Sequence, residues 1–291
     1  MKILLNGNEM HLHEGTTLGA VLRERPDGFR RPPNGAVLVR EMGLNVGVFS
    51  ANGEAWKHQR RMVMASFAPG QVRSYFPSLL RVAQRLRGRW QEAARAGRPI
   101  ALQADLMRYT VDGVAGLAFG TDINTLESDE DVIQRHLDKV FPALVRRMMS
   151  IVPYWRYVRL PADRALERSV IAINEAIRNF IAQARARMQT NPALREQPAN
   201  LLEAMIVAAE QPDSGMSDAD IEGNVLTMLL AGEDTTANTL AWMIYLLQRN
   251  PLALQRATEE VRRAAPNTAT FTPEQMASLD YLEACAHETM R

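Results

Sequence analysis

The sequence predicts a mainly α-helical fold with a small β element at its start. Three observations support this. Apolar residues recur at helical spacing through most of the chain, one long apolar segment has clear helix start and stop signals, and strand signals are confined to the first residues. A length of 291 residues, 46% of them hydrophobic, suffices for one large domain. We expect a single domain over 1–291, with a hairpin at 1–14 and a helical part over 16–291.

The first fifty residues are predicted to contain only short elements. Ile3-Leu4-Leu5 and Met10-His11-Leu12 are typical of two short strands, turned at Gly7-Asn8. A short helix is expected over 17–25. Because Pro, Gly and Asn recur at intervals over 26–50, we interpret that segment as a long loop, of the kind that is often functional.

Helices are expected to follow one another through the rest of the chain. Apart from the long central one, they are predicted at 53–67, 69–97, 102–119, 129–149, 162–188, 198–210, 252–265 and 278–291. An interruption is expected near Pro77, and Pro142 should kink its helix because an interior proline removes a hydrogen bond. The helix over 162–188 should bury the side that carries Ile171, Ile173, Ile177, Phe180 and Ile181.

The central helix has the clearest boundaries in the sequence. Ser217, with Asp220 three residues on, matches a capping box, and Asn250-Pro251 is a stop signal. A helix of about 32 residues is about 48 Å long at 1.5 Å per residue, which would cross a whole domain. Its polar centre argues against a membrane span, because a span needs about 20 mostly apolar residues in a row.

That polar centre, Ala-Gly-Glu-Asp-Thr-Thr at 231–236, is unusual for a core helix. Gly costs about 1 kcal/mol of helix stability relative to Ala, and a buried carboxylate costs more unless it is paired, hydrated or protonated. The Thr235 hydroxyl can bond the carbonyl of Ala231, which tends to bend a helix, and Gly232 leaves room for the bend. We predict a local opening lined by Thr235 and Asp234, where a small polar molecule and a water could sit beside a flat cofactor. The alternative is a hydrated helix defect without chemistry.

Two further pairs carry little weight when each is taken alone. Trp56 and Arg60 are spaced i, i+4, so they share a helix face and together suit an anionic group on a planar body. Ordinary stacking of Arg60 on Trp56 is the simpler interpretation. Glu288 and Arg291, at i, i+3, form a pair that is common on helix surfaces.

The charges and the cysteine content limit the partners and the compartment. The formal net charge is +1, so the overall charge predicts no nucleic-acid partner. The segment 57–98 has ten Lys or Arg and one acid, which indicates a solvated helix face or a docking surface for an acidic protein. Cys285 is the single cysteine, so a disulfide framework is excluded and a reducing, cytoplasmic location is expected. No membrane segment is visible in the sequence.

Taken in order, these motifs resemble those of the cytochrome P-450 family of haem-thiolate monooxygenases. The likeness consists of Trp-x-x-x-Arg, then Ala-Gly-x-Asp-Thr-Thr, then Glu-x-x-Arg in an α-rich chain, and it covers 16–291. Short motifs around these three also match the family. They are Phe49-Ser50 before Gly53-Glu54, Phe67-x-Pro69, and Leu279-x-Tyr281-Leu282-Glu283-Ala284-Cys285 before Glu288.

The resemblance implies a haem (iron protoporphyrin) whose distal face is crossed by the central helix. Thr235 would hold dioxygen and its water in place, and Asp234 would gate proton delivery. Thr227 and Leu230 would face an apolar small-molecule substrate. The residues of this helix implied to bind the cofactor are Ala231, Gly232 and Thr235.

The resemblance also implies a role for the pairs Trp56–Arg60 and Glu288–Arg291 and for the basic segment. Trp56 and Arg60 would bond a haem propionate. Glu288 and Arg291 would be structural, tying the last helix to the loop that positions the haem. The basic region 57–98 lies where the family docks its redox partner, a ferredoxin, a flavodoxin or a reductase.

By the same resemblance, the segments 26–50 and 129–160 should shape the substrate pocket. The second of these carries several basic residues. We interpret them as surface arginines, with an acid-bearing, lipid-like substrate as the alternative. They are Arg146, Arg147, Arg156 and Arg159.

The sequence assigns no metal ligand. The family's iron ligand is a cysteine in a loop after the Glu-x-x-Arg helix, whereas the sequence stops at Arg291 and Cys285 matches a non-ligand position. Because the thiolate pushes electron density toward oxygen, we expect a fragment of a longer monooxygenase that is inactive alone. The alternatives are a non-catalytic helical module that binds haem or a hydrophobic ligand, and a fragment without stable function.

Overall fold

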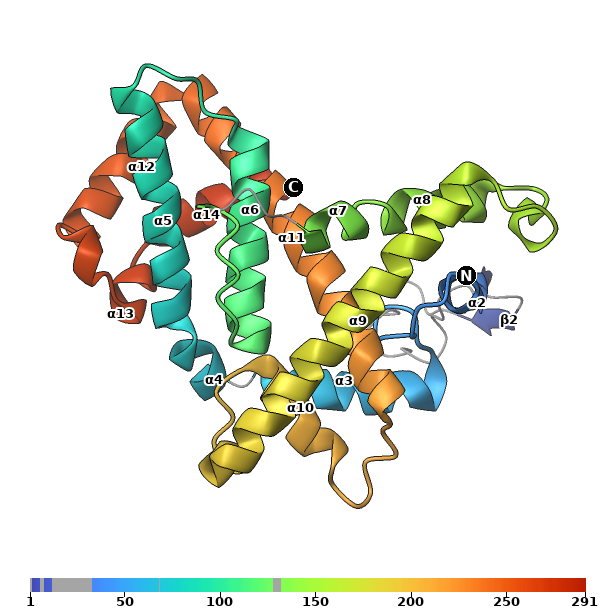
Figure 1. Cartoon of the computed structure of the whole chain (residues 1–291). Helices are drawn as coiled ribbons and strands as arrows, with labels where there is room; N and C mark the ends of the chain where they lie inside the picture. The colour runs from blue at the N-terminus through green and yellow to red at the C-terminus, as the bar shows by residue number, and fades with distance from the viewer. Residues whose placement is uncertain (1, 6–7, 12–32, 68, 128–131) are drawn as a thin grey trace.

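The computed structural model describes residues 2–5, 8–11, 33–67, 69–127 and 132–291 (Figure 1). At the start of the chain, β1 (Lys2–Leu5) and β2 (Asn8–His11) pair antiparallel, with Lys2 opposite His11 and Leu5 opposite Asn8. Residues 6 and 7, between the strands, lie outside the described residues, as does the predicted helix over 17–25.

Helix α2 (Pro33–Glu41) occupies part of the segment that the sequence predicted as a loop, so that prediction is wrong for these nine residues. Pro33 stands at the first helical position, where a missing N–H costs nothing. The helix packs on α8 (Val140–Met149). Leu38 and Met42 are buried in this region, and this packing stabilises a segment whose local sequence favours a loop.

The next four helices lie where they were predicted. They are α3 (Gly53–Ser66), α4 (Pro69–Ser74), α5 (Phe76–Arg95) and α6 (Leu102–Val114). The interruption expected near Pro77 is confirmed, because α4 ends before Tyr75 and Pro77 lies in the first turn of α5. A π-helical turn over Ala115–Phe119 extends α6.

The segment after α6 differs from its prediction in one respect. It forms α7 (Val132–Leu137) and α8, with the break at residues 138 and 139. Pro142 is the third residue of α8, where no intrahelical N–H bond is lost, so the predicted kink at Pro142 is wrong. A 3-10 turn over Tyr154–Arg156 follows α8.

Helix α9 (Pro161–Thr190) confirms the predicted span and most of its buried side. Ile173, Ile177, Phe180 and Ile181 are buried, whereas Ile171 is 54% exposed, so its predicted burial is wrong. Residues two positions apart in an α-helix point in directions that differ by about 200° around the axis, so Ile171 lies on the opposite side from Ile173.

The last part of the chain is again helical. A short 3-10 turn, Pro192–Arg195, precedes α10 (Leu201–Ala209), and another, Thr268–Thr270, precedes α13 (Pro273–Met276). The remaining helices are α11 (Asp218–Arg249), α12 (Pro251–Ala264) and α14 (Asp280–Thr289). The capping box at the start of α11 is confirmed, because Ser217 and Asp220 exchange side-chain and backbone hydrogen bonds. Within the described residues, no helix is both long and apolar enough to cross a membrane.

Helix α11 runs through the middle of the molecule and separates two sets of helices (Figure 1). Its first half packs among α3, α9 and α10, and this region holds the larger apolar core. The middle of the helix packs on α6, where Thr110 meets Glu233 and Gln103 meets Asn238. Its second half also meets α12 and α14. A smaller core joins α5, α6 and α11 through Val82, Leu86, Leu106, Leu126 and Ala237.

Candidate functional site

The loop between α2 and α3 crosses directly over the first half of α11. The Asn224 side-chain oxygen accepts the Val48 backbone N–H at 2.8 Å, and the Thr227 hydroxyl donates to the Gly223 carbonyl at 2.8 Å. A Cβ on Gly223 would lie 2.6 Å from the carbonyl atoms of Val46, so only glycine permits this crossing. The crossing fixes the loop as a wall beside the 231–236 motif of α11.

The motif itself confirms one prediction and corrects another. The Thr235 hydroxyl donates to the Ala231 carbonyl at 2.7 Å, as predicted. The predicted local opening of the helix is wrong, because α11 is helical throughout. The Thr110 hydroxyl of α6 donates to the Glu233 carbonyl at 2.9 Å, and a Cβ on Gly232 would lie 2.4 Å from Val114. Close packing against α6 therefore accounts for the glycine.

Two cavities lie on either side of this motif. The first, here called the loop-side cavity, has a volume of about 340 Å³ and lies between the α2–α3 loop, α8 and α11. The second, the α6-side cavity, has a volume of about 450 Å³ and lies between α3, α6 and α11. Thr227 and Ala231 line both, so α11 forms the partition between them.

The predicted residues of α11 are divided between these cavities. Leu230, Asp234 and Thr235 line the loop-side cavity, and Gly232 lines the α6-side cavity. Apolar side chains dominate both walls, and burial raises the pKa of Tyr109, so its phenol stays protonated in the wall of the α6-side cavity. Each of the predicted site residues on α11 therefore lines at least one of the two cavities.

One face of α3 leads from the Trp56–Arg60 pair into the α6-side cavity. Val63 and Phe67 line that cavity and follow Arg60 at i+3 and i+7, which places them on the helix face of Trp56 and Arg60. Within the described residues, neither the Trp56 indole N–H nor the exposed Arg60 guanidinium has a side-chain partner. An apolar recess that continues into two unused donors fits a flat, apolar cofactor with an anionic edge.

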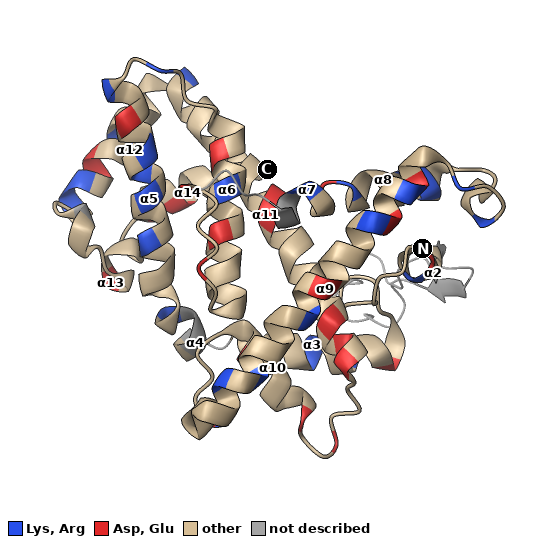
Figure 2. Cartoon of the chain, in the orientation of Figure 1, with Lys and Arg blue, Asp and Glu red and all other residues tan. Residues whose placement is uncertain are grey.

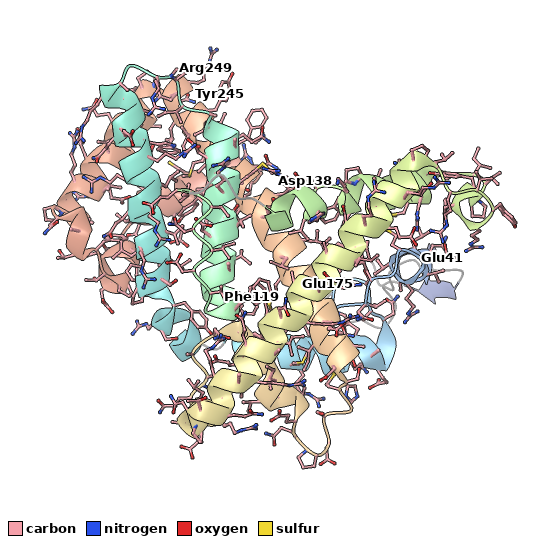
Figure 3. All side chains as sticks on the ribbon, viewed as in Figure 1. Glu41, Phe119, Asp138, Glu175, Tyr245 and Arg249 are labelled. Carbon is pink, nitrogen blue, oxygen red and sulfur yellow. The ribbon has the colours of Figure 1, made fainter. Side chains whose placement is uncertain are left out.

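Asp234 lies between the loop-side cavity and a third cavity of about 580 Å³. The third cavity is also lined by Glu233, Asp138 and Arg146, and Asp138 lies where α7 approaches α11 (Figure 3). Asp234 is half-buried, whereas Thr235 is exposed. The Asp234 carboxylate therefore borders a cavity with several charged residues in its wall and also the cavity that Thr235 lines.

The remaining predicted residues lie on or near the surface of α14. Glu288 and Arg291 form an exposed ion pair, with the guanidinium 2.9 Å from the carboxylate. Cys285 is partly buried in the same helix. Among the described residues, no group of three His, Cys, Asp or Glu side chains could hold a metal ion.

The basic segment 57–98 runs from α3 through α5, where Lys and Arg recur along the ribbon (Figure 2). Part of its charge is neutralised within the chain. Among the described residues, at least five of its ten cations lie within 4.0 Å of a carboxylate: Lys57, Arg81, Arg85, Arg89 and Arg98. The strongest anchor is Arg85, which donates twice to Asp122 and thereby lowers the pKa of that carboxyl. Half of the basic run therefore serves local structure.

The fold is that of a helical protein with two mostly apolar cavities on either side of one central helix. The family model described as cytochrome P450 matches residues 10–291. The chain is 26% identical over 270 residues to cytochrome P450 CYP94D108 of Paris polyphylla, across 88% of this chain and 52% of that protein. It is 29% identical to the self-sufficient cytochrome P450 monooxygenase CYP505AG1 of Oidiodendron maius (strain Zn), across 86% of this chain and 23% of that one.

A comparison with solved structures also finds a cytochrome P450. The cytochrome P450DA heme domain aligns with a TM-score of 0.73 and 25% identity, across 93% of this chain and 57% of that chain. This chain belongs to the cytochrome P450 family. It spans about half the length of CYP94D108 and of the carotene epsilon-monooxygenase of Arabidopsis thaliana, at 52% and 48%.

Several residues of the site were not found from the sequence. Gly47, Asn224 and Thr110 fix the loop and α6 against α11, yet each acts through a partner more than a hundred residues away. The sequence did contain a signal for this crossing, because Asn224 and Thr227 closely follow Gly223 in the apolar central helix. Small and polar residues within an apolar helix indicate that another backbone segment approaches closely.

Proposed function

We propose that this chain provides the helix-lined part of a haem site for a monooxygenase that oxidises an apolar organic substrate with O2 and electrons from a redox partner. The observation that carries the proposal is the α6-side cavity, which joins Ala231 and Gly232 of α11 to the α3 face of Trp56 and Arg60. We also propose that residues 1–291 form one domain.

The proposed haem-binding residues act through charge and shape. Trp56 and Arg60 would donate hydrogen bonds to the propionates. The bound group would be held against Ala231, whose small side chain allows close approach, and beside Gly232, which lines the same cavity. The bound haem would supply the activation of dioxygen. Glu288 and Arg291 would stabilise the position of α14.

Thr235 and Asp234 would deliver protons to the space beside the cofactor. The Thr235 hydroxyl donates to Ala231, so its oxygen lone pairs remain available to accept a proton donor at that position. Asp234 would carry protons between the third cavity and the Thr235 side, because it lines both spaces.

The loop-side cavity would bind the substrate. Its walls are mostly apolar, and Thr227 and Leu230 lie on the path from the α2–α3 loop to Thr235. Its volume of about 340 Å³ is in the range of ligand pockets for small molecules. The redox partner, a ferredoxin, a flavodoxin or a reductase, would dock near 57–98, where Arg61 and Arg95 are exposed.

Titration of the whole chain with haem tests the proposal. Arg60→Leu should weaken haem binding by about tenfold or more, because a charge-assisted hydrogen bond is lost. Arg61→Leu is the matched control, since Arg61 is an exposed neighbour on α3 with the same charge. Equal effects of the two substitutions, or no haem uptake, would overturn the proposed site.

A carbon monoxide difference spectrum of the reduced, haem-loaded chain separates the two remaining functions. A thiolate-type spectrum would show that residues 1–291 supply the iron ligand and would overturn the expectation that this chain alone is inactive. A histidine-type or five-coordinate spectrum without turnover supports a non-catalytic haem-binding module.

A further inference from the structure

A fourth cavity lies behind the α2–α3 loop, between α2, α3 and the first turn of α11. This space, here called the polar cavity, has a volume of about 450 Å³, which is in the range of pockets for small molecules. Asn45 and Ser50 line both the polar cavity and the loop-side cavity, so the α2–α3 loop separates the two. The polar cavity therefore lies outside the proposed substrate and haem sites.

Gln59 of α3 has a buried oxygen atom that accepts no hydrogen bond from the described residues. The residue lines the polar cavity and is 3% exposed. Its Nε2 donates to the Val46 carbonyl at 3.1 Å and to the Asp220 carboxylate at 2.9 Å, and these two acceptors fix which end of the amide is the oxygen. The Oε1 atom is left without a donor. Buried acceptors without donors are rare, so this one indicates a donor that comes from outside the chain.

The two charged residues in the wall of the polar cavity have opposite signs and are not paired. Arg40 lies on α2, and Asp220 lies in the first turn of α11. Within the part of the chain that the structure describes, no ion pair joins them, and neither has an ion-pair partner elsewhere. The Asp220 carboxylate accepts hydrogen bonds from the uncharged Gln59 and Ser217 instead. One cation and one anion of this wall are therefore available to a ligand.

Other charged groups around α2 are paired. Arg156 pairs with Glu41, which lies at the end of α2 (Figure 3). Arg147 has a side chain that is 3% exposed and lies 3.6 Å from the Asp163 carboxylate, so its interpretation from the sequence as a surface arginine is wrong. Its guanidinium also stacks 5.1 Å from the centre of the Trp155 ring. The unpaired charges of the polar cavity are thus an exception in this region.

The unused groups of the wall together match a small zwitterion. A primary ammonium group has donors and no acceptor, so it suits the Asp220 carboxylate and the Gln59 oxygen. A carboxylate suits the Arg40 guanidinium, which offers a planar fork of donors. Small and apolar residues make up much of the remaining wall, and they suit a short apolar side chain. They include Ala36, Val37, Ala51, Ala55 and Ala219.

We propose that the polar cavity binds a free amino acid with a short apolar side chain. Its ammonium group donates to the Asp220 carboxylate and to Oε1 of Gln59, and its carboxylate accepts from Arg40. Because Oε1 is shielded, neighbouring side chains move aside when the ligand enters. This binding does not involve the 231–236 motif and does not require haem.

Calorimetry on the whole chain without haem, with three related ligands, tests this proposal. L-valine carries both charges, 2-methylpropan-1-amine lacks the carboxylate, and 3-methylbutanoate lacks the ammonium group. L-valine should bind about tenfold or more tightly than either of the other two, because each of them loses a charge-assisted hydrogen bond.

Two substitutions should each remove one half of this preference. Arg40→Gln should abolish the preference for L-valine over the amine and keep the preference over 3-methylbutanoate, and Asp220→Asn should do the reverse. Arg61→Gln and Asp218→Asn are the matched controls. Arg61 is an exposed arginine of α3, Asp218 is an exposed acid in the first turn of α11, and neither lines the polar cavity.

Circular dichroism verifies that each variant is folded, and the exposed Arg40 decides the matter if Asp220→Asn does not fold. Equal affinity for the three ligands, no binding of L-valine, or equal effects of Arg40→Gln and Arg61→Gln overturns the amino-acid site. The expected pattern in a chain that takes up no haem leaves the amino-acid site intact and overturns the proposed haem site instead.

Discussion

The two halves of α11 have similar apolar sequences but different surroundings. In the first half, Ile221, Val225 and Leu226 are at most 4% exposed, because the α2–α3 loop, α9 and α10 cover them. In the second half, Trp242 and Tyr245 are 60% and 51% exposed. Figure 3 labels Tyr245 on this half of the helix. The 231–236 motif lies at the boundary, with a cavity on each side.

This difference shows that the neighbours of a helix, more than its composition, decide which of its positions are core. The exposed side chains of the second half form an apolar surface, and such surfaces usually mark interaction sites. The first half should therefore tolerate little change, and the second half should tolerate much more.

Removal of a large side chain should show the largest contrast. Leu226→Ala, at a 4% exposed site, should lower the free energy of unfolding by about 2–5 kcal/mol, because it leaves a cavity in the larger core. Leu246→Ala, at a 39% exposed site, should lower it by about 1 kcal/mol or less. Urea unfolding measures both, and equal losses would contradict the division of α11 into two regions.

Addition of a methyl group should show the next largest effect. Gly223→Ala pushes a Cβ against the Val46 carbonyl, and this overpacking should cost about 1–3 kcal/mol or displace the loop. Gly88→Ala is the control, because Gly88 lies within α5 with open space around it. That control should stabilise the chain by about 0.5–1 kcal/mol, through helix propensity. Stabilisation by both substitutions would show that the loop does not cross α11 so closely.

A pH effect should distinguish the second region, where a carboxylate of α12 binds the first turn of α14. Glu260 of α12 accepts the backbone N–H groups of Tyr281 and Leu282 at 2.9 Å each, and these bonds hold its pKa below 4.5. Because the folded pKa is the lower one, the stabilisation is present above the ordinary pKa of a glutamate and is lost as the pH falls through the folded value.

Amide exchange of Tyr281 and Leu282, corrected for intrinsic rates, measures this effect. Their protection should fall at acid pH in the wild-type chain but change little with pH in Glu260→Gln, which lacks the titrating group. A Glu283→Gln control, at an exposed site on α14, should keep the wild-type profile. Identical acid profiles for the wild type and Glu260→Gln would show that the bonds do not depend on the Glu260 charge.

Local signals in the sequence predicted much of the fold and some of the site. The caps of α11, the Thr235–Ala231 bond and the shared face of Trp56 and Arg60 depend on residues within one or two turns, so their spacing suffices to predict them. The chain order of the motifs identified the family, because three spaced motifs together are far more specific than any one of them.

Features that depend on distant neighbours were not predicted. The burial of Arg147 depends on the α8–α9 connection folding back to place Trp155 and Asp163 around it. Helix α2 depends on packing against α8. The glycine of the central motif was interpreted as room for a bend, whereas Val114 of α6 occupies the space beside it.

The smallest effect is expected at the Glu-x-x-Arg pair of α14. Glu288 and Arg291 are 64% and 81% exposed, so water screens their attraction, and Glu288→Gln should change the free energy of unfolding by about 0.5 kcal/mol or less. Thermal unfolding of the variant at low and high salt measures this. A loss as large as that of Leu226→Ala would show that this exposed pair anchors α14 to the second half of α11, and that the two regions are more equally stabilised than their burial indicates.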